Sequence, residues 1–373
     1  MPRCLRKMLL GVFVILCVTS NITCYASAPE ISAKAYILME AESGRVLLSH
    51  NETQELSIAS TTKIMTALVA LEHSSLSDVV TVKDAHLKEG SSMYLRSGEK
   101  LTMEQLLYGL MLPSGNDAAE CIADFCGGGV EQFVVWMNEK AAQLGMSHTS
   151  FANPSGLDQK GHYSCAQDMA VLAARALREP TLARLVSTVD VSIGSRSMHN
   201  HNKLLGSYPG CIGLKTGYTG DAGRTLVTCA ERDGMRLIAV TLYDGNDWQD
   251  HKALYDFGFS AYQMKRPLRR GESLGTVAVR GGKAVSVQAV AASSFGWPCT
   301  PEEQLTVQLA LSEKVSAPVH TGDILGEAII MQDGAEIGRV ALRSNEEIEA
   351  VEPAEQSSVL QRLLGLFSAQ KGG

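Results

Sequence analysis

The sequence predicts an α+β fold, in which an antiparallel sheet packs against helices and is followed by a small all-β unit. Apolar residues alternate as in strands near both ends of residues 29–262 and recur at helical spacing between them. Short alternating runs then dominate residues 266–345. With 373 residues, of which 45% are apolar and 6% aromatic, the chain is long enough for two domains.

The elements of residues 29–262 follow in order. A hairpin opens the region at residues 35–48. Helices are predicted at residues 58–72, 102–111, 118–125, 132–144 and 166–177, with a loop at 147–164 before the last of them. A second hairpin turns at Asp233-Gly234, and a closing helix covers residues 248–259. Strands from both ends would therefore share one sheet packed by the helices.

Residues 1–26 have the layout of a secretory signal peptide. Three basic residues within the first seven precede an apolar run at residues 8–18, which is too short to span a membrane comfortably. Cleavage after Ala26 is favoured over cleavage after Ala28, because Pro29 follows the latter. An uncleaved N-terminal anchor is the alternative, and in both cases the protein is expected to be exported.

Charge and cysteine content narrow the possible partners. Without residues 1–26 the chain keeps 30 basic and 40 acidic residues, a net charge of −10, so nucleic acid is not an expected partner. Six cysteines remain. Cys121 and Cys126 have poor spacing for a mutual bridge on a helix, and we interpret most of the six as small buried apolar residues. No C-x-x-C pair is present, so no metal or cofactor is predicted. His199 and His201 are interpreted as surface loop polarity.

The segment Ser60-Thr61-Thr62-Lys63 sets a hydroxyl three residues before an amine at the start of a predicted helix. Positions i and i+3 share a helix face. A serine hydroxyl needs a base within about 3 Å, and a lysine with a lowered pKa can be that base. By itself the pair is common, since serine at a helix start followed by a solvated lysine needs no function.

Two further motifs indicate that the pair has a catalytic function. Ser114-Gly115-Asn116 lies in a turn before a predicted helix, and Lys215-Thr216-Gly217 lies beside a strand-like stretch. S-x-x-K, S-D-N and K-T-G form the signature set of class A β-lactamases and penicillin-binding proteins, and here glycine is the middle residue of the second. Without the other motifs, Ser114 and Asn116 would be interpreted as a helix N-cap cluster.

These motifs, together with residues 94–99 (Tyr-Leu-Arg-Ser-Gly-Glu), 151–157 (Phe-Ala-Asn-Pro-Ser-Gly-Leu) and 215–220, resemble the low-molecular-mass penicillin-binding proteins that act as D-alanyl-D-alanine carboxypeptidases. The resemblance covers nearly all of the chain after the signal peptide. It implies a serine β-lactamase-like catalytic domain, peptidoglycan stem peptides ending in D-Ala-D-Ala as substrates, and β-lactams as covalent inhibitors.

The resemblance also implies roles for the catalytic residues. Ser60 would attack the carbonyl between two D-alanines, and Lys63 would accept its proton, giving an acyl-enzyme that water releases. Ser114 would relay the proton to the leaving amine, and Asn116 would orient the substrate amide and Lys63. A nearby Lys215 would lower the pKa of Lys63 by like-charge repulsion.

The third motif is expected to bind the substrate. Lys215 and Thr216 would supply a cation and a hydroxyl for the terminal carboxylate of the peptide. Gly217 would let the substrate backbone approach closely. The backbone amides of Ser60 and Tyr218 would form the oxyanion hole.

Three other functions compete with this one. A β-lactamase of class A needs a loop glutamate for deacylation, and residues 147–164 contain Asp158 but no glutamate. A transpeptidase or endopeptidase would use the same acyl-enzyme with another acceptor or substrate. A non-catalytic cell-wall scaffold would not require complete motifs.

The C-terminal third has no obvious catalytic residues. Residues 266–345 are interpreted as a spacer or interaction module. Residues 346–373 form an acidic linker followed by apolar residues on one helical face: Val359, Leu360, Leu363, Leu364 and Phe367. We expect this helix to lie on the outer face of the cytoplasmic membrane, the alternative being a helix that docks on the protein.

Overall fold

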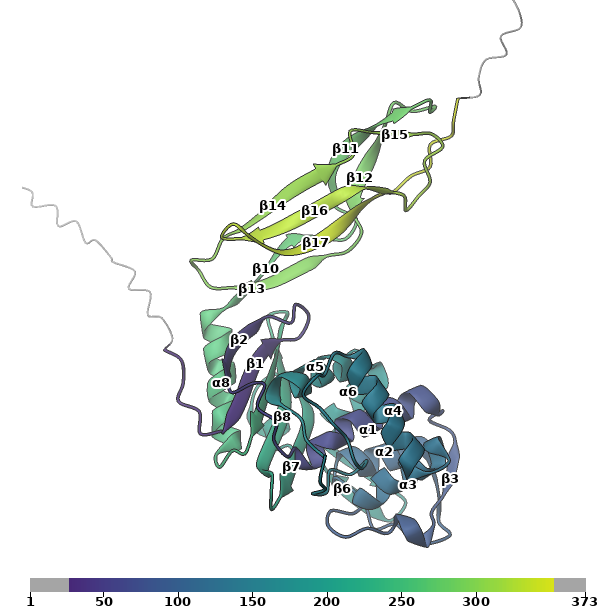
Figure 1. The fold of residues 1–373 in the computed structure, drawn as a ribbon, viewed down its shortest axis with the longest axis vertical. Helices are drawn as coiled ribbons and strands as arrows, with labels where there is room; N and C mark the ends of the chain where they lie inside the picture. Colours follow the sequence, from purple (N-terminus) through teal and green to yellow (C-terminus); the bar gives the residue numbers. More distant parts are fainter. Residues whose placement is uncertain (1–26, 352–373) are drawn as a thin grey trace, which may run out of the picture.

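The computed structural model describes residues 27–351, which form two units that follow each other along the chain (Figure 1). The first is built around a five-stranded antiparallel sheet in the order β2-β1-β9-β8-β7. The second holds a six-stranded sheet in the order β14-β16-β17-β12-β11-β15. The predicted α+β class, with an all-β unit after the helical one, is confirmed.

The first unit has a run of helices between its first and last strands. Its strands are β1 (Ala35–Glu40), β2 (Val46–His50), β3 (Val79–Thr81), β4 (Lys100–Thr102), β5 (Asp190–Ile193), β6 (Arg196–His199), β7 (Cys211–Thr219), β8 (Gly223–Arg232) and β9 (Met235–Leu242). Its helices are η1 (Ala59–Thr62), α1 (Lys63–His73), η2 (Asp84–His86), α2 (Met103–Met111), α3 (Asn116–Gly127), α4 (Val130–Gln143), α5 (Ala166–Leu177), α6 (Pro180–Ser187), α7 (Leu204–Ser207) and α8 (Asp247–Ala261).

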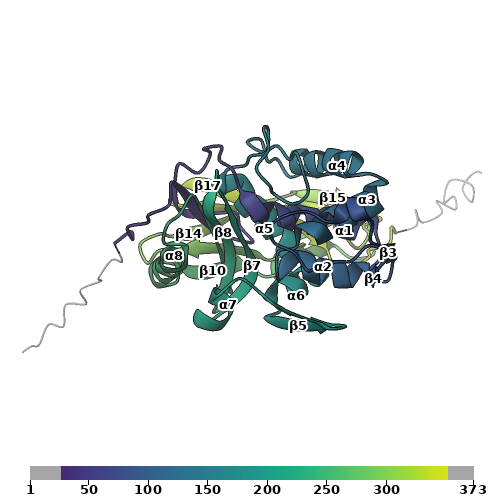
Figure 2. The same ribbon diagram turned by 90° about the horizontal axis from the view of Figure 1, so that it is seen from below.

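The central sheet is buried on both faces because its strands alternate two apolar sets. Ile37 and Val240 face α1 and the helices around it, whereas Leu38 and Ala239 face α8. Figure 2 shows α8 on one side of the sheet and α1 to α4 on the other. Among the described residues strand β7 pairs with β8 alone, so its other edge has no strand partner there.

Most predicted elements of the first unit are confirmed, with shifts of a few residues at their ends. The predicted helix at residues 58–72 differs in kind at its start. Ala59–Thr62 is a 3₁₀ turn, and the α-helix begins only at Lys63. Helix α6, the β5–β6 hairpin and α7 were not predicted, since each of these elements is short.

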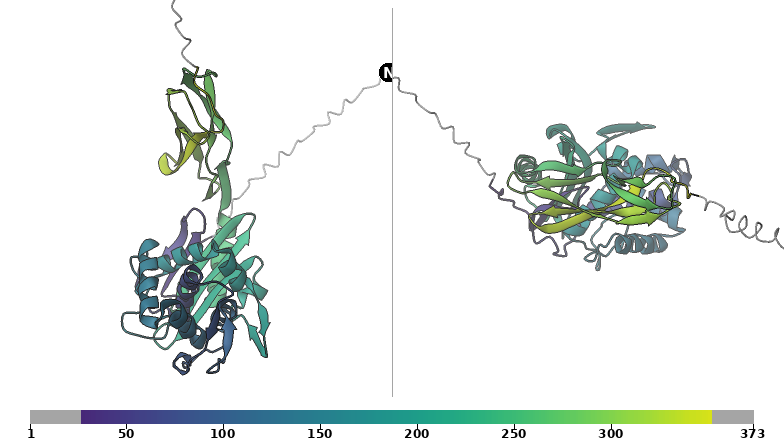
Figure 3. Two further views of the ribbon diagram at one scale, coloured as in Figure 1. Left: turned by 90° about the vertical axis from the view of Figure 1, so that its right-hand side faces the viewer. Right: turned by 90° about the horizontal axis from the view of Figure 1, so that it is seen from above.

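The second unit lies beyond the end of the first (Figure 3). Its strands are β10 (Gln263–Leu268), β11 (Ser273–Arg280), β12 (Ser286–Ala291), β13 (Phe295–Cys299), β14 (Leu305–Leu311), β15 (Lys314–Ser316), β16 (Ile324–Gln332) and β17 (Ala335–Ser344). A small apolar core that includes Val277, Leu325 and Leu342 holds the sheet together. The pair β10–β13 lies between this sheet and the first unit.

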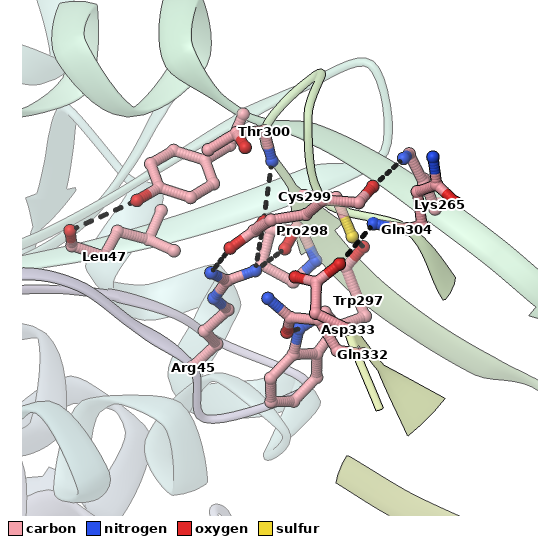
Figure 4. Close-up of polar contacts among 12 residues, drawn as sticks. Arg45, Leu47, Lys265, Trp297, Pro298, Cys299, Thr300, Gln304, Gln332 and Asp333 are labelled. Atoms are coloured by element: carbon pink, nitrogen blue, oxygen red, sulfur yellow. Dashed lines mark hydrogen bonds and ion pairs between the residues drawn. The ribbon is translucent and has the colours of Figure 1, made fainter. Parts of the chain in front are cut away.

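Arg45, in the β1–β2 turn, joins the two units (Figure 4). Its guanidinium donates to the carboxylate of Glu303 in a bidentate pair and to the carbonyl oxygen of Pro298. It also lies over the rings of Tyr262 and Trp297, at 5.3 and 5.6 Å from their centroids. Bidentate pairing and stacking on two rings favour one orientation of the guanidinium, so we infer a defined junction.

Two predicted segments lie outside the described residues: the signal peptide at 1–26 and nearly all of the membrane-surface segment at 346–373. Within residues 27–351, every helix is too short or too polar to cross a bilayer.

Arg45→Ala tests the junction. The change leaves the partly buried Glu303 carboxylate without its cation, so we expect the free energy of unfolding to fall by about 1–2 kcal/mol. Calorimetry should then resolve two transitions that lie closer together in the wild type. The control is Arg339→Ala, which removes an exposed arginine of β17 and should leave the melting profile unchanged. Identical melting of wild type and Arg45→Ala would contradict the proposed role.

Candidate active site

The candidate nucleophile lies in a turn held by hydroxyl groups. Thr61 Oγ1 donates to the carbonyl oxygen of Ile58 over 2.6 Å, and Thr62 Oγ1 donates to that of Ala59 over 2.8 Å. Thr225 Oγ1, from β8, also donates to the carbonyl oxygen of Ile58. Ser60 therefore lies in a short 3₁₀ turn that is tied to the sheet, immediately before α1.

Lys63 begins α1 and is fully buried. Its Nζ lies 2.9 Å from Ser60 Oγ, 2.8 Å from Asn116 Oδ1 and 2.6 Å from the carbonyl oxygen of Ser155. Three different segments of the chain thus meet at one amine, and every one of its hydrogen-bonding positions is occupied.

The pKa of Lys63 lies well below its ordinary value. Burial is the largest cause, since removal from water disfavours the charged form, and the positive charge of Lys215 adds to it. The carboxylates of Asp117 and Glu120 act in the opposite direction. We expected repulsion by Lys215 to lower this pKa, and it does so, but as the smaller of the two causes.

The second motif does not form an N-cap cluster, which was the alternative interpretation. Gly115 is the N-cap residue of α3 and makes no side-chain cap. Asn116 instead accepts from Lys63 and donates through Nδ2 to the carbonyl oxygen of Glu89 over 2.7 Å. Ser114 has a left-handed backbone with φ of 65°, and its buried hydroxyl has no hydrogen-bond partner among the described residues. Such a hydroxyl is available to a bound molecule.

The third motif lies on the edge strand β7. The Lys215 side chain is 1% exposed, and its Nζ donates to the carbonyl oxygen of Thr216 over 3.1 Å. Burial lowers the pKa of Lys215 to about 7. Lys215 therefore lies beneath the strand rather than at the surface of the cleft, whereas Thr216 and Tyr218 line the cleft itself.

Gly217 is required for the strand to approach the nucleophile. A Cβ atom at this position would lie 3.0 Å from the backbone nitrogen of Ser60 and 2.5 Å from Thr225 Oγ1. We expected the glycine to make room for the substrate backbone. The atoms that its missing side chain accommodates belong to β8 and to the turn of Ser60, which brings β7 directly beside the nucleophile.

A cavity of about 640 Å³ opens over these residues. Its lining includes Ser60, Ser91, Ser114, Thr216, Gly217 and Tyr218, and it continues past His199, Asn200, His201, Lys203, Arg224, Asp247 and Trp248. His199 and His201 are exposed, as expected for surface polarity, and both also line the cavity.

The far wall of the cavity carries two exposed cations. Arg224 donates to Asp247 Oδ1 over 2.6 Å and lies 5.6 Å from the centroid of the Trp248 ring, and Lys203 Nζ lies 5.9 Å from the same centroid. Asp247 is the single carboxylate among the residues that line the cavity, so this wall favours an anionic ligand.

Three functional groups escaped prediction from sequence. The carbonyl oxygen of Ser155 holds Lys63, and a backbone acceptor has no signal of its own in a sequence. The buried carboxylate of Asp117 accepts four hydrogen bonds, three of them from Ser92, Met93 and Leu95, and so organises the wall that contains Ser91. The Arg224 side chain lies on a face that only the register of β8 reveals.

Comparison with known proteins agrees with this site. The family model for D-alanyl-D-alanine carboxypeptidase matches residues 22–246, and the model for the C-terminal domain of penicillin-binding protein 5 matches residues 262–350. The chain is 32% identical over 335 residues to the D-alanyl-D-alanine carboxypeptidase DacF of Bacillus subtilis, covering 85% of this chain and 86% of DacF.

Solved structures give the same relationship. Penicillin-binding protein 5 of Haemophilus influenzae superposes with a TM-score of 0.76 at 28% identity, covering 87% of this chain and 99% of that one. A mutant of the Streptomyces K15 DD-transpeptidase superposes with a TM-score of 0.60 at 34% identity, covering 62% of this chain and 99% of that one. By these matches, the chain belongs to the D-alanyl-D-alanine carboxypeptidase family.

Proposed function

We propose that the protein is an exported serine-type D-Ala-D-Ala carboxypeptidase that removes the terminal D-alanine from peptidoglycan stem peptides and is acylated by β-lactams. The observation that carries the proposal is the buried Lys63 amine 2.9 Å from Ser60 Oγ. Burial keeps the pKa of Lys63 low, so a neutral amine is available as a base beside the nucleophile.

Acylation follows from this contact. Ser60 Oγ attacks the carbonyl carbon between the two D-alanines while its proton passes to Lys63 Nζ. The C–N bond then breaks, and the leaving amine takes this proton from Lys63 Nζ through the hydroxyl of Ser114, which has no partner among the described residues. Water later attacks the ester carbonyl and gives a proton to Lys63 Nζ. The ester C–O bond then breaks, the shortened peptide leaves as its carboxylic acid, and Lys63 passes the proton to Ser60 Oγ.

The developing oxyanion needs donors that are fixed beforehand. We assign the backbone N–H groups of Ser60 and Tyr218. The support for this assignment is the close packing of Gly217, next to Tyr218, against the backbone nitrogen of Ser60. The two N–H groups thus come from segments that touch each other.

The positive charge of the cleft suits the terminal carboxylate of the substrate. Thr216 offers a hydroxyl at the strand edge, and the buried Lys215 contributes its field through the strand. Lys203 and Arg224 add exposed positive charge along the same cavity. A peptide without a free carboxylate would lose these interactions, which favours removal of a terminal residue.

The acyl acceptor separates this function from its nearest alternatives. The K15 relative is a DD-transpeptidase by name, and a transpeptidase would transfer the same acyl group to an amine. A class A β-lactamase would require a deacylating glutamate, and residues 147–164 contain none.

We also propose that the chain is secreted and then held at the outer face of the cytoplasmic membrane. The supports are the signal-like pattern of residues 1–26 and the apolar helical face of residues 359–367.

The activity is tested with purified protein and a peptide ending in D-Ala-D-Ala. We expect release of free D-alanine and labelling by fluorescent penicillin, both abolished in Ser60→Ala. Added glycine or D-amino acids should not consume most of the acyl-enzyme, as they would in a transpeptidase. Labelling that survives Ser60→Ala would refute the assignment of the nucleophile.

Gly156→Ala tests the contact between Ser155 and Lys63. The new Cβ would lie 1.9 Å from the carbonyl oxygen of Ala59, so the loop must move and withdraw the Ser155 oxygen from Lys63. We expect penicillin acylation to slow roughly 100-fold. Gly161→Ala is the matched control, because Gly161 has a similar φ of 83° in the same loop but no atom within 4 Å of its Cβ position. Equal acylation rates in the two variants would show that the clash with the Ala59 carbonyl does not slow acylation.

Truncation tests the membrane proposal. A chain ending at Gln356 should appear in the soluble fraction of the cell envelope, whereas the full chain sediments with membranes. D-Ala release by the purified truncated protein should be unchanged. Equal sedimentation of both forms would remove residues 357–373 as the anchor.

A further inference from the structure

Asp158 is the acid in loop 147–164, where a class A β-lactamase would carry its deacylating base. In the structure Asp158 does not occupy the position of such a base. Asp158 does not line the cleft. Its Oδ1 accepts from Thr219 Oγ1 over 2.6 Å, and its Oδ2 accepts from the backbone N–H of Asp221 over 3.3 Å. Both oxygens thus face the β7–β8 turn, away from Ser60 and Lys63.

The first half of the same loop is part of the catalytic machinery. Asn153 Oδ1 accepts from the backbone N–H groups of Ser155 and Gly156, which shapes the turn. Gly156 packs on the Ala59 carbonyl, and the Ser155 carbonyl holds Lys63. Only Leu157 separates Gly156 from Asp158, so a force on the Asp158 carboxylate reaches the lysine contact through a very short piece of chain.

The partner of Asp158, Thr219, belongs to the edge strand β7. Thr219 is the last residue of β7 and follows Tyr218, whose N–H we assign to the oxyanion hole. Thr219 Oγ1 also accepts from the backbone N–H of Ala222 over 3.1 Å, so one hydroxyl links the carboxylate to the turn. In the described residues β7 has a strand partner on one side only, so the contact of Thr219 with Asp158 adds a second link at this end of the strand.

We propose that Asp158 is a positioning residue that fixes the end of β7 relative to the loop holding Lys63, and so sets the distance between the oxyanion donor and the base. The inference rests on the proposed function, since it concerns the acylation step. A charged acceptor strengthens the hydrogen bond to Thr219, which suits a contact that must persist on an exposed surface. Misplacement of reacting groups by 1 Å can cost about 100-fold in rate.

The test separates acylation from deacylation. In Asp158→Ala we expect the second-order rate of penicillin acylation and the kcat for D-Ala release to fall together by roughly 30-fold, with KM changed less than about 3-fold. Asp158→Asn keeps an acceptor for Thr219 and should recover most of the rate. Thr219→Val should resemble Asp158→Ala, and the double variant should be no slower than either single one.

Asp221→Asn is the matched control. It removes one negative charge beside the same contact, but only the backbone of Asp221 takes part in that contact, so its rates should stay within about 2-fold of wild type, as is usual for a surface substitution. All rates are measured at a temperature at which circular dichroism shows every variant folded.

Three results would overturn the inference. Normal acylation with slowed deacylation in Asp158→Ala would identify the carboxylate as a base for water. Wild-type rates in Asp158→Ala would show that the contact has no role. Equal losses in Asp158→Ala and Asp221→Asn would show a general charge effect. If the wild type neither releases D-alanine nor reacts with penicillin, the proposed function itself fails, which is distinct from these three results.

Discussion

The site depends on one constraint, which is that a lysine amine must be held without water beside a serine. Lys63 loses its hydration entirely, and burial of an unpaired polar group is costly. Its three acceptors, Ser60 Oγ, Asn116 Oδ1 and the Ser155 carbonyl oxygen, offset that cost. Each comes from a different segment, so the hydrogen-bonding requirement of one amine determines how the η1 turn, α3 and the loop before α5 must meet.

The other elements of the site are arranged around Lys63 Nζ. The nucleophile turn is tied to β8 through Thr225, and β7 packs on the turn because Gly217 has no side chain. Helix α3 brings Asn116 to the lysine, while Asp117 holds the loop that forms one wall of the cleft. The edge strand β7, the turn before α1 and the start of α3 thus converge on a cavity whose lining, in the described residues, comes from the first unit.

Sequence reasoning found the residues whose chemistry is carried by their side chains. Ser60, Lys63 and Asn116 were predicted from motif spacing, and the structure brings them within hydrogen-bond distance. The single sheet shared by strands from both ends of residues 29–262 and the closing helix α8 followed from hydrophobic periodicity. The contribution of Ser155 depends on a backbone carbonyl, and that of Arg224 depends on strand register, so neither leaves a local pattern. The position of Lys215 beneath β7 likewise follows from tertiary packing rather than from its motif.

Two acids of α3, Asp117 and Glu120, explain how Lys63 can both accept and release a proton. A base must accept a proton from Ser60 and later release it, so its pKa must lie neither too high nor too low. Burial and Lys215 disfavour the ammonium form, whereas Asp117 and Glu120 favour it. Without the carboxylates, the amine would be a poor acceptor when Ser60 attacks. With water in place of burial, it would stay protonated and could not act as a base at all. The balance of these groups, rather than proximity alone, makes the serine a nucleophile.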